Sequence, residues 1–487
     1  MIDAPHWTSA GELAAAIGRG ELSSLELLEH FVARIRALDG PVNAVVAWDL
    51  ERARATARQA DAAVAAGGPL GPLHGVPMTI KDSFPTAGCV TTSGSTDLAD
   101  FVPAEDAWPV ARLRAAGAIP FAKTNLPVFA DDIQSFNDVY GTTNNPHDLT
   151  RTPGGSSGGS SAALAMGFTP LELGSDIGGS IRVPAHYSGV MGHKPSYGLV
   201  PGHGQIPGMP GTLTQADLAV VGPLARSADD LELALDVLAG PDRWTAPAWR
   251  LDLPPRAADD LAGYRIAAWI DDEFAPVDRD TRAALGAMVD ALETAGASVD
   301  TGARPGFTLD KAFTVYGELL FAALSGAVPK DRLDEFARAT GDDPMSWIMR
   351  SSAARHRDWL SNNERRLQLR ERWAEFFTRF DAVLLPVHQR PALPHDHSMP
   401  QFSRTVEIDG VERPYLDLWK WIAPAGVGML PATVAPVGAS TDGLPIGVQV
   451  VGPYLHDRTT IHLAGLINDQ MAARHGWPAA CPRPPIA

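Results

Sequence analysis

The stretch GGSSGGSS, from Gly154 to Ser161, is followed closely by GSDIGGSIR, from Gly174 to Arg182, and these two turns decide how the chain is interpreted. Glycine lets a backbone approach a ligand closely and adopt positive φ angles, while serine supplies hydroxyl groups for attack or proton relay. Before the second turn, LELGSD from Leu171 to Asp176 alternates apolar and polar residues like a short strand. Flexible linkers lack such ordered neighbours, so we interpret both turns as parts of one active site.

The composition is that of an acidic globular chain of 487 residues, 45% hydrophobic and 20% charged, with a formal net charge of −17. This composition excludes wholesale disorder and argues against nucleic-acid and anionic-membrane partners, which select basic patches. The N-terminus has no basic stretch before an unbroken apolar run, and no segment is apolar for long enough to span a bilayer. We therefore expect a cytoplasmic protein, for which length alone suggests two domains.

The rare residue types narrow the chemistry. The chain has only two cysteines, Cys89 and Cys481, and they match neither a disulfide framework nor a zinc-ligand spacing. Among 40 basic residues only six are lysines, so a lysine inside an apolar strand needs a reason. Lysine can lose its proton at a tolerable cost, whereas arginine cannot. Lys81 in VPMTIK, Lys123 in AIPFAK and Lys194 are the lysines in such settings.

Strand-like and helix-like segments alternate along the chain, which predicts an α/β architecture with a mixed or parallel sheet. The stretch 309–380 is mostly helical, with an apolar stripe in its last helix and Ser361 to Asn363 as cap candidates. Expected strands are 76–81, 118–123, 171–176, 264–270, 298–300, 382–387, 432–436 and 444–451, and expected helices are 10–18, 22–38, 109–116, 160–167, 229–238, 280–295 and 457–473.

Two serines compete as nucleophile. The run from Gly154 to Gly158 matches G-x-S-x-G, but that elbow must follow a buried strand, and the preceding NNPHDLTRTP is too polar for one. The same run lacks the Gly-Lys-Ser/Thr ending of a phosphate-binding loop. Ser180 is the better candidate because it follows a strand and the turn Asp176–Gly179, whose N–H groups can converge on one oxygen.

The base is not decided by the residues alone. His186 and His193 lie nearest downstream of Ser180, in loop-like sequence. Lys81 is an alternative, since burial under an apolar strand would desolvate its ammonium and leave a neutral amine that accepts a proton. A buried ion pair with Asp82 or Asp176 explains Lys81 equally well, and Lys123 and Lys194 have similar settings.

In several stretches the chain resembles the amidase signature family of serine hydrolases. The stretches that carry the resemblance extend through most of the chain, and residues 242–379 match least. The spacing of 75 residues between Lys81 and Ser156 also agrees with the family pattern. The matching stretches are GVPMTIKDSF, FAKTNLP, GTTNNPHD, PGGSSGGSSAALA, GSDIGGSIRVPA, GHKPSYGLVP and GLPIGVQVVGPYLHD.

The resemblance implies a fold, a set of site residues and a reaction. The fold is a single α/β/α domain around a large mixed sheet, spanning residues 1–487, with a variable and mostly helical substrate-side segment at about 305–380. The reaction is hydrolysis of a carboxamide through an acyl-enzyme, with no metal or organic cofactor. The implied residues are Ser180 as nucleophile, Ser156 as the bridging cis-serine and Lys81 as ultimate base, the amides of Ile177, Gly178, Gly179 and Ser180 as oxyanion hole, and Ser157, Asp176 and Arg182 as a supporting network.

Other functions stay open. The glutaminase subunit of a tRNA-dependent amidotransferase shares the signature, but typically has threonine where this chain has Ile177 and glutamine where it has Val183. A non-enzymatic binding protein on an amidase scaffold is the other alternative, although every catalytic position that we map is filled. Family members are often homodimers, so a homodimer is a further expectation.

The substrate is expected to be a small-molecule amide with an aryl or medium-sized apolar group, with esters and carbamates as side substrates. The pocket is expected between residues 129–140, 204–209 and 307–379. Its aromatic and aliphatic side chains include Phe136, Tyr140, Ile206, Phe313, Tyr316, Trp347 and Trp359. Core packing explains these side chains equally well.

Overall fold

The computed structural model describes residues 4–477 and 481–487, and its central element is a mixed sheet of eleven strands. Pairing is parallel from β3 through β2 to β6 and from β11 through β9 to β10, and antiparallel elsewhere. The predicted α/β class and large mixed sheet are thereby confirmed. In spatial order the strands are β1 (Val45–Trp48), β3 (Ile119–Thr124), β2 (Pro77–Lys81), β6 (Leu171–Asp176), β8 (Val220–Ala225), β7 (Met191–Lys194), β14 (Ala432–Ala439), β15 (Pro445–Val451), β11 (Ala382–Pro386), β9 (Arg265–Ala268) and β10 (Ser298–Asp300).

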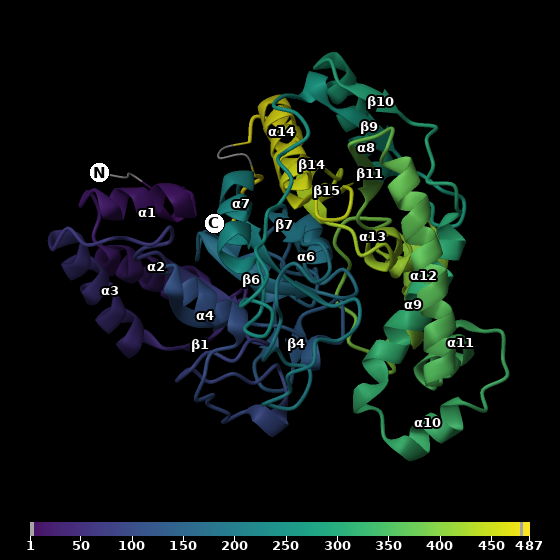
Figure 1. The fold of residues 1–487 in the computed structure, drawn as a ribbon, viewed down its shortest axis with the longest axis horizontal. Coiled ribbons are helices and arrows are strands. Elements are labelled where there is room, and N and C mark those ends of the chain that lie inside the picture. Colours follow the sequence, from purple (N-terminus) through teal and green to yellow (C-terminus); the bar gives the residue numbers. More distant parts are fainter. Residues whose placement is uncertain (1–3, 478–480) are drawn as a thin grey trace.

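Helices flank the sheet (Figure 1), and most of its strands are buried on both faces. Strand β11 shows the alternation: Leu384 packs into one hydrophobic cluster, while Val383 and Leu385 pack into the other. The helices are α1 (Ala10–Gly18), α2 (Ser24–Leu38), α3 (Leu50–Ala65), α4 (Trp108–Ala115), α5 (Gly158–Ala165), α6 (Arg182–Ser188), α7 (Ala228–Leu238), α8 (Arg279–Thr294), α9 (Leu309–Leu324), α10 (Lys330–Phe336), α11 (Pro344–Ser352), α12 (His356–Phe376), α13 (Ala423–Val427) and α14 (Asp457–His475).

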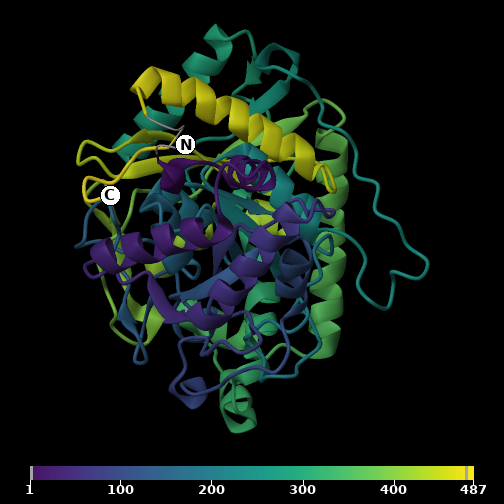
Figure 2. The same ribbon diagram turned by 90° about the vertical axis from the view of Figure 1, so that its left-hand side faces the viewer.

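The two hydrophobic clusters draw on different helices. The first contains buried side chains of α1, α2, α3, α4, α7, α8 and α14, and the second contains those of α6, α9, α12 and α13. Figure 2 shows α14 in yellow crossing the top of the molecule and α12 in green running along one side. Two small hairpins, β4 (Phe136–Asn137) with β5 (Gly141–Thr142) and β12 (Thr405–Ile408) with β13 (Val411–Pro414), lie outside the large sheet.

Most predicted elements are confirmed within one or two residues, while strand β14 extends to Ala439, three residues beyond its predicted end at Pro436. Helix α5 begins at Gly158 rather than Ser160, so it includes part of the first glycine–serine turn. Helix α12 begins at His356, so Ser361 to Asn363 lie inside it and the predicted cap there is wrong. The backbone N–H of Arg355 donates to Asp358 Oδ2 at 3.0 Å, which satisfies a donor at the true helix start.

No helix within residues 4–477 and 481–487 combines the length and the apolar character needed to cross a bilayer.

Candidate active site

Strand β2 ends in Lys81, and this side chain is fully buried. Its Nζ atom donates hydrogen bonds to Ser156 Oγ at 2.7 Å and to Ser175 Oγ at 3.0 Å. Ser156 comes from the first glycine–serine turn and Ser175 from β6, the next strand in the sheet. The fold therefore joins a lysine amine to serine hydroxyls that lie 75 and 94 residues further along the chain.

The turn that holds Ser156 is packed tightly against a second loop. The peptide bond between Gly155 and Ser156 is cis. A Cβ atom at Gly155 would lie 2.7 Å from both Asp132 O and Ile133 C, so a residue with a side chain would collide with this backbone. Glycine is required here by the close approach of two chain segments, and the result is a buried Ser156 hydroxyl that faces Lys81.

Ser180 lies at the end of the loop between β6 and α6 and is 6% exposed. Its carbonyl oxygen accepts a hydrogen bond from the backbone N–H of Ser157 at 3.1 Å, which ties the two glycine–serine turns together. Its Oγ forms no hydrogen bond to another described residue. Gly178, earlier in the loop, lies under the indole of Trp419, because a Cβ atom there would be 2.8 Å from Trp419 Nε1.

Asp176 and Arg182 hold the ends of this loop together. Arg182 donates to Asp176 through Nε at 3.0 Å and through Nη2 at 2.9 Å, and both side chains are buried. Burial opposes ionisation of Asp176, but the charge and hydrogen bonds of Arg182 keep its pKa at about 2. Arg182 also donates to Ile422 O and to Gln449 Oε1, both at 3.1 Å. The ion pair thereby anchors the Ser180 loop to α13 and β15.

One predicted oxyanion donor is already engaged in the structure. The backbone N–H of Gly179 donates to Asp176 Oδ1 at 2.9 Å, and Gly179 has a φ of +96°. Among the described residues, the N–H groups of Ile177, Gly178 and Ser180 have no such acceptor. Ser157, predicted to support the site, contributes its backbone N–H to Ser180, while its hydroxyl is buried without a partner among the described residues.

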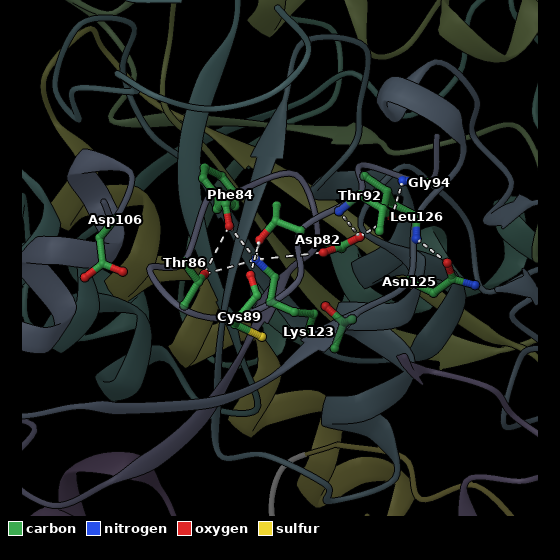
Figure 3. A network of polar contacts seen from close by, with 12 residues as sticks. Asp82, Phe84, Thr86, Cys89, Thr92, Gly94, Asp106, Lys123, Asn125 and Leu126 are labelled. Carbon is green, nitrogen blue, oxygen red and sulfur yellow. Dashed lines mark hydrogen bonds and ion pairs between the residues drawn. The ribbon is translucent and has the colours of Figure 1, made fainter. Parts of the chain in front are cut away.

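The other two candidate lysines, Lys123 and Lys194, face different groups. Lys123, on β3, donates to Phe84 O and to Thr86 Oγ1 at 3.0 Å, and lies 3.9 Å from Asp82 Oδ1 (Figure 3). Lys194, on β7, donates to Pro195 O at 3.0 Å. Of the three lysines that the sequence left undecided, only Lys81 contacts serine hydroxyls within the described chain.

Burial changes the acidity of Lys81. Desolvation lowers its pKa to about 7, while the negative charges of Asp176 and Glu172 act in the opposite direction. A lysine with such a pKa is partly neutral near neutral pH and can accept a proton. Asp82, the other predicted ion-pair partner, instead accepts hydrogen bonds from the backbone and hydroxyl of Thr92 at 3.0 and 2.6 Å.

The two candidate histidines are held by other groups. His186 Nδ1 accepts from the backbone N–H of Gly447 at 2.7 Å, and its Nε2 lies 3.2 Å from Arg390 O. His193 contacts Thr433 Oγ1 at 2.9 Å and Asp457 Oδ1 at 3.1 Å. Both rings use both nitrogens elsewhere, so neither is positioned as a base for Ser180.

Several contacts of the site could not be found by sequence motifs. Ser175 binds Lys81, and Tyr316 donates its hydroxyl to Ile177 O at 2.8 Å. Glu172 is a buried carboxyl group on the same strand as Ser175 and Asp176. The available signal for Glu172 was a charged residue between two leucines of a predicted buried strand.

The predicted pocket side chains are only partly brought together. Tyr316 reaches the Ser180 loop, and Phe313 packs against Trp347 in a tilted arrangement with ring centroids 5.7 Å apart. Trp359 instead donates its indole N–H to Asp217 Oδ2 at 3.0 Å, and Phe136 stacks on His397 at 3.8 Å. Trp359 and Phe136 thus have partners of their own.

A separate cavity of about 910 Å³ opens beside α12 and is lined among others by Arg370, Trp373 and Tyr454. It includes none of the residues around Ser180, so we do not assign it to the reaction. Within the described residues, no group of three histidine, cysteine, aspartate or glutamate side chains is arranged to hold a metal ion.

Comparison with known proteins connects this geometry to a family. The model of the family described as Amidase matches residues 26–461. The chain is 33% identical to the A subunit of the glutamyl-tRNA(Gln) amidotransferase of Salinispora tropica, covering 94% of this chain and 96% of that protein. It is 34% identical to the corresponding protein of Roseiflexus castenholzii, covering 92% of each chain.

Solved structures of similar proteins share the fold over nearly the whole chain. A crystal structure of an amidase is 29% identical with a TM-score of 0.78, covering 95% of this chain and 100% of that one. The 6-aminohexanoate cyclic dimer hydrolase, solved with its substrate, is 26% identical with a TM-score of 0.76 and 99% coverage of both chains. A bacterial aryl acylamidase has a TM-score of 0.82 at 24% identity, covering 98% of this chain and 99% of that one, which speaks for the fold alone.

Proposed function

This chain belongs to the amidase signature family, whose enzymes act on amide C–N bonds. We propose that it hydrolyses an amide bond through an acyl-enzyme on Ser180. The observation that carries this proposal is the buried contact of 2.7 Å between Lys81 Nζ and Ser156 Oγ, next to the loop of Ser180. In this proposal Lys81 is the base, Ser156 the bridging serine and Ser180 the nucleophile.

In the proposed reaction, one proton moves from Ser180 through Ser156 to Lys81 and then to the leaving nitrogen. Neutral Lys81 accepts the Ser156 hydroxyl proton while Ser156 accepts that of Ser180, and Ser180 Oγ attacks the amide carbon. The C–N bond then breaks as the same path returns the proton to the leaving nitrogen, since an unprotonated amine anion leaves poorly. Water next attacks the acyl-enzyme by the same route, releasing the carboxylic acid and regenerating Ser180.

The oxyanion of each tetrahedral intermediate needs N–H donors that are free when the charge forms. Because the N–H of Gly179 is engaged by Asp176, we assign this task to Ile177, Gly178 and Ser180. Asp176 and Arg182 keep these amides in place without contacting the substrate themselves.

For the substrate, the comparisons support glutamine better than the aryl or medium-sized apolar amides that the sequence suggested. The curated relatives at 33% identity are A subunits of glutamyl-tRNA(Gln) amidotransferases. We therefore propose as the first candidate that the chain is a glutaminase subunit that supplies ammonia within a tRNA-dependent amidotransferase. Its partners would then be the other subunits of such a complex.

A specific observation supports an apolar amide as the second candidate. The Ser180 loop is covered by the aromatic side chains of Trp419 and Tyr316, and Val183 is fully buried behind it. Neither Ile177 nor Val183 offers the hydroxyl or amide that the glutaminase pattern places there. An aryl or aliphatic acyl group matches such surroundings, whereas the charged ends of glutamine require polar partners.

The test of the reaction is covalent labelling. The protein is treated with a fluorophosphonate and the modified peptide is identified by mass spectrometry, with Ser180→Ala and Ser156→Ala variants alongside. We expect an adduct on Ser180 that is absent in Ser180→Ala. An adduct on Ser156 in the unaltered protein would overturn the assignment.

The test of the substrate compares initial rates on glutamine, an anilide and acetamide. Ammonia released from glutamine, raised by added amidotransferase subunits, would support the glutaminase subunit. A kcat/KM for the anilide well above those for acetamide and glutamine would support the apolar amide instead.

A further inference from the structure

Glu172 is a buried carboxyl group beside the proposed base, and the reaction as described does not use it. It is 1% exposed and lies on β6, where it pairs in register with Thr79 of the parallel strand β2. Side chains two residues apart in a strand share a face, so Thr79 and Lys81 point to the side that Glu172 also occupies. The Cα atoms of Glu172 and Lys81 are then roughly 8 Å apart, from the rise and spacing of strands.

The surroundings of Glu172 contain donors but no cation at contact distance. Thr79 donates its hydroxyl to Glu172 Oε1 at 2.5 Å, and the backbone N–H of Leu173 donates to Oε2 at 3.0 Å. The hydroxyl groups of Thr124 and Ser160 also face the carboxyl. Within the described chain, no lysine, arginine or histidine forms a salt bridge with Glu172.

The charged groups near Glu172 are few. Lys81 on β2 is on its face of the sheet, while Lys123 on β3 is aligned with Ile80 and so belongs to the other face, although the charge of Glu172 also opposes the lowering of the Lys123 pKa by burial. Asp176, on the same strand as Glu172, is paired with Arg182. The remaining elements packed against this part of β6, strand β8 and helix α5, carry no titratable side chain.

This setting couples the two groups electrostatically. Burial raises the pKa of Glu172 to about 7, although the hydroxyls of Thr79, Thr124 and Ser160 and the Leu173 N–H favour its ionised form. Burial lowers the pKa of Lys81 into the same range, against the charges of Asp176 and Glu172. A carboxylate near an ammonium group in a buried layer makes the ammonium harder to deprotonate.

We propose that Glu172 is a positioning residue that controls the charge of Lys81. Ionised Glu172 holds the proton on Lys81 and keeps the amine from accepting a proton from Ser156, while protonated Glu172 releases this restraint. The inference rests on the proposed function, in which neutral Lys81 is the base. Glu172 itself contacts neither the substrate nor Ser156 or Ser180 in this role.

The test is the pH dependence of fluorophosphonate labelling of Ser180 in Glu172→Gln. Glutamine keeps the shape and can accept from Thr79, but it carries no charge. The acid limb of the labelling rate is expected to move to lower pH, and labelling near pH 7, where Glu172 of the parent is partly ionised, should become severalfold faster. An acid limb that stays in place or moves upward would overturn the proposal.

A second variant and a matched control guard against a general loss of structure. Thr79→Val removes the strongest donor to ionised Glu172 and should move the acid limb in the same direction by a smaller amount. Asp39→Asn is the control: Asp39 is also a buried carboxyl held by backbone N–H groups, those of Ala44 and Val45, and burial also raises its pKa, to about 6. The acid limb of the Ser180 labelling rate in Asp39→Asn should lie at the same pH as in the parent.

Stability gives a readout that does not require activity. A carboxyl whose pKa is raised on folding stabilises the native state fully below its unfolded pKa and loses this contribution as pH rises through the folded pKa of about 7. Glu172→Gln should therefore gain stability relative to the parent between about pH 4.5 and 8, measured by urea unfolding. If neither the parent nor the variants are labelled at any pH, the proposed function fails, but urea unfolding still tests the titration of Glu172. A difference in unfolding free energy between Glu172→Gln and the parent that does not change with pH would contradict this titration.

Discussion

Lys81 and Lys123 occupy adjacent strands of one sheet, yet they face different chemistry. Both side chains are buried, and burial lowers the pKa of both. Lys81 contacts two serine hydroxyls, whereas Lys123 contacts a carbonyl oxygen, threonine hydroxyls and the carboxylate of Asp82 (Figure 3). Burial alone therefore does not make a lysine a base; the face of the sheet on which it lies decides its partners.

The group of Lys81 with Ser156 and Ser175 (the Lys81 cluster) and the group of Lys123 with Asp82 and Thr86 (the Lys123 cluster) also differ in what they contribute to the structure. The Lys123 cluster holds the loop after β2: Asp82 accepts from Thr92, and the backbone N–H of Ser93 donates to Asp82 O at 3.1 Å. Ser93 O in turn accepts from the backbone N–H of Phe129, near the segment that packs on Gly155. The contacts of Lys123 thus hold the loop after β2, whereas Lys81 and its two serines are the groups that we propose to react.

The strongest way to break this comparison is to remove the Lys81 amine. Lys81→Met should lower kcat by roughly 10²- to 10⁴-fold, the usual contribution of a general base. The melting temperature should stay level or rise, because a desolvated amine is replaced by an apolar group of similar length. Steady-state kinetics and thermal unfolding measure both effects. A large fall in melting temperature together with retained activity would reverse the roles of the two lysines.

The corresponding change at Lys123 should act mainly on stability. Lys123→Met leaves the buried Asp82 carboxylate without its cation, which typically costs about 3 kcal/mol of unfolding free energy. The fraction that remains folded should still label at Ser180. Adding Asp82→Asn to Lys123→Met should recover part of the loss, and strictly additive effects in urea unfolding would argue against a coupled pair.

The pH dependence of the parent sharpens the comparison without a mutation. The amine of Lys81 must be neutral to act, and its pKa is lowered to about 7. The rate should therefore rise from pH 6 to 8 and fall about tenfold for each unit below the pKa. Labelling of Ser180 over this range measures it. A flat profile with chemistry shown to be rate-limiting would exclude Lys81 as the base.

The smallest expected effect concerns single hydroxyl partners. Ser175→Ala removes one of the two hydrogen bonds that orient Lys81 and should lower the plateau rate about threefold to tenfold, since such a bond contributes about 1 kcal/mol. Thr86→Val removes a comparable partner of Lys123 and should leave the plateau unchanged. Equal effects of both variants on the labelling rate would show that the two lysine clusters are not functionally distinct.

Much of the fold could be predicted because local patterns were strong. The alternation in LELGSD predicted β6, and the three- and four-residue spacing of apolar positions predicted α1 and α2 closely. The start of α12 was missed because polar residues within a long helix resemble a cap. The expectation that residues 1–487 form one domain stays a prediction.

The site was predictable only in part. The sequence indicated Lys81, Ser156 and Ser180 as candidates, and their catalytic roles remain proposals to be tested by labelling. It did not indicate that the N–H of Gly179 is engaged by Asp176, nor that Glu172 lies on the face of Lys81. The first fact depends on the local conformation of the loop after β6, and the second depends on the pairing of β2 with β6, whose register no motif encodes.

The sequence by itself determined the types of the elements, the family and the short list of reactive residues, because periodicity, turn residues and rare lysines are local properties. Only the tertiary structure decided which lysine meets which hydroxyl. Strands β2, β3 and β6 are joined by long connections, and a shift of one residue in their register would exchange the two faces of the sheet. The position of an amine relative to a serine 75 residues away is therefore set by strand pairing and packing.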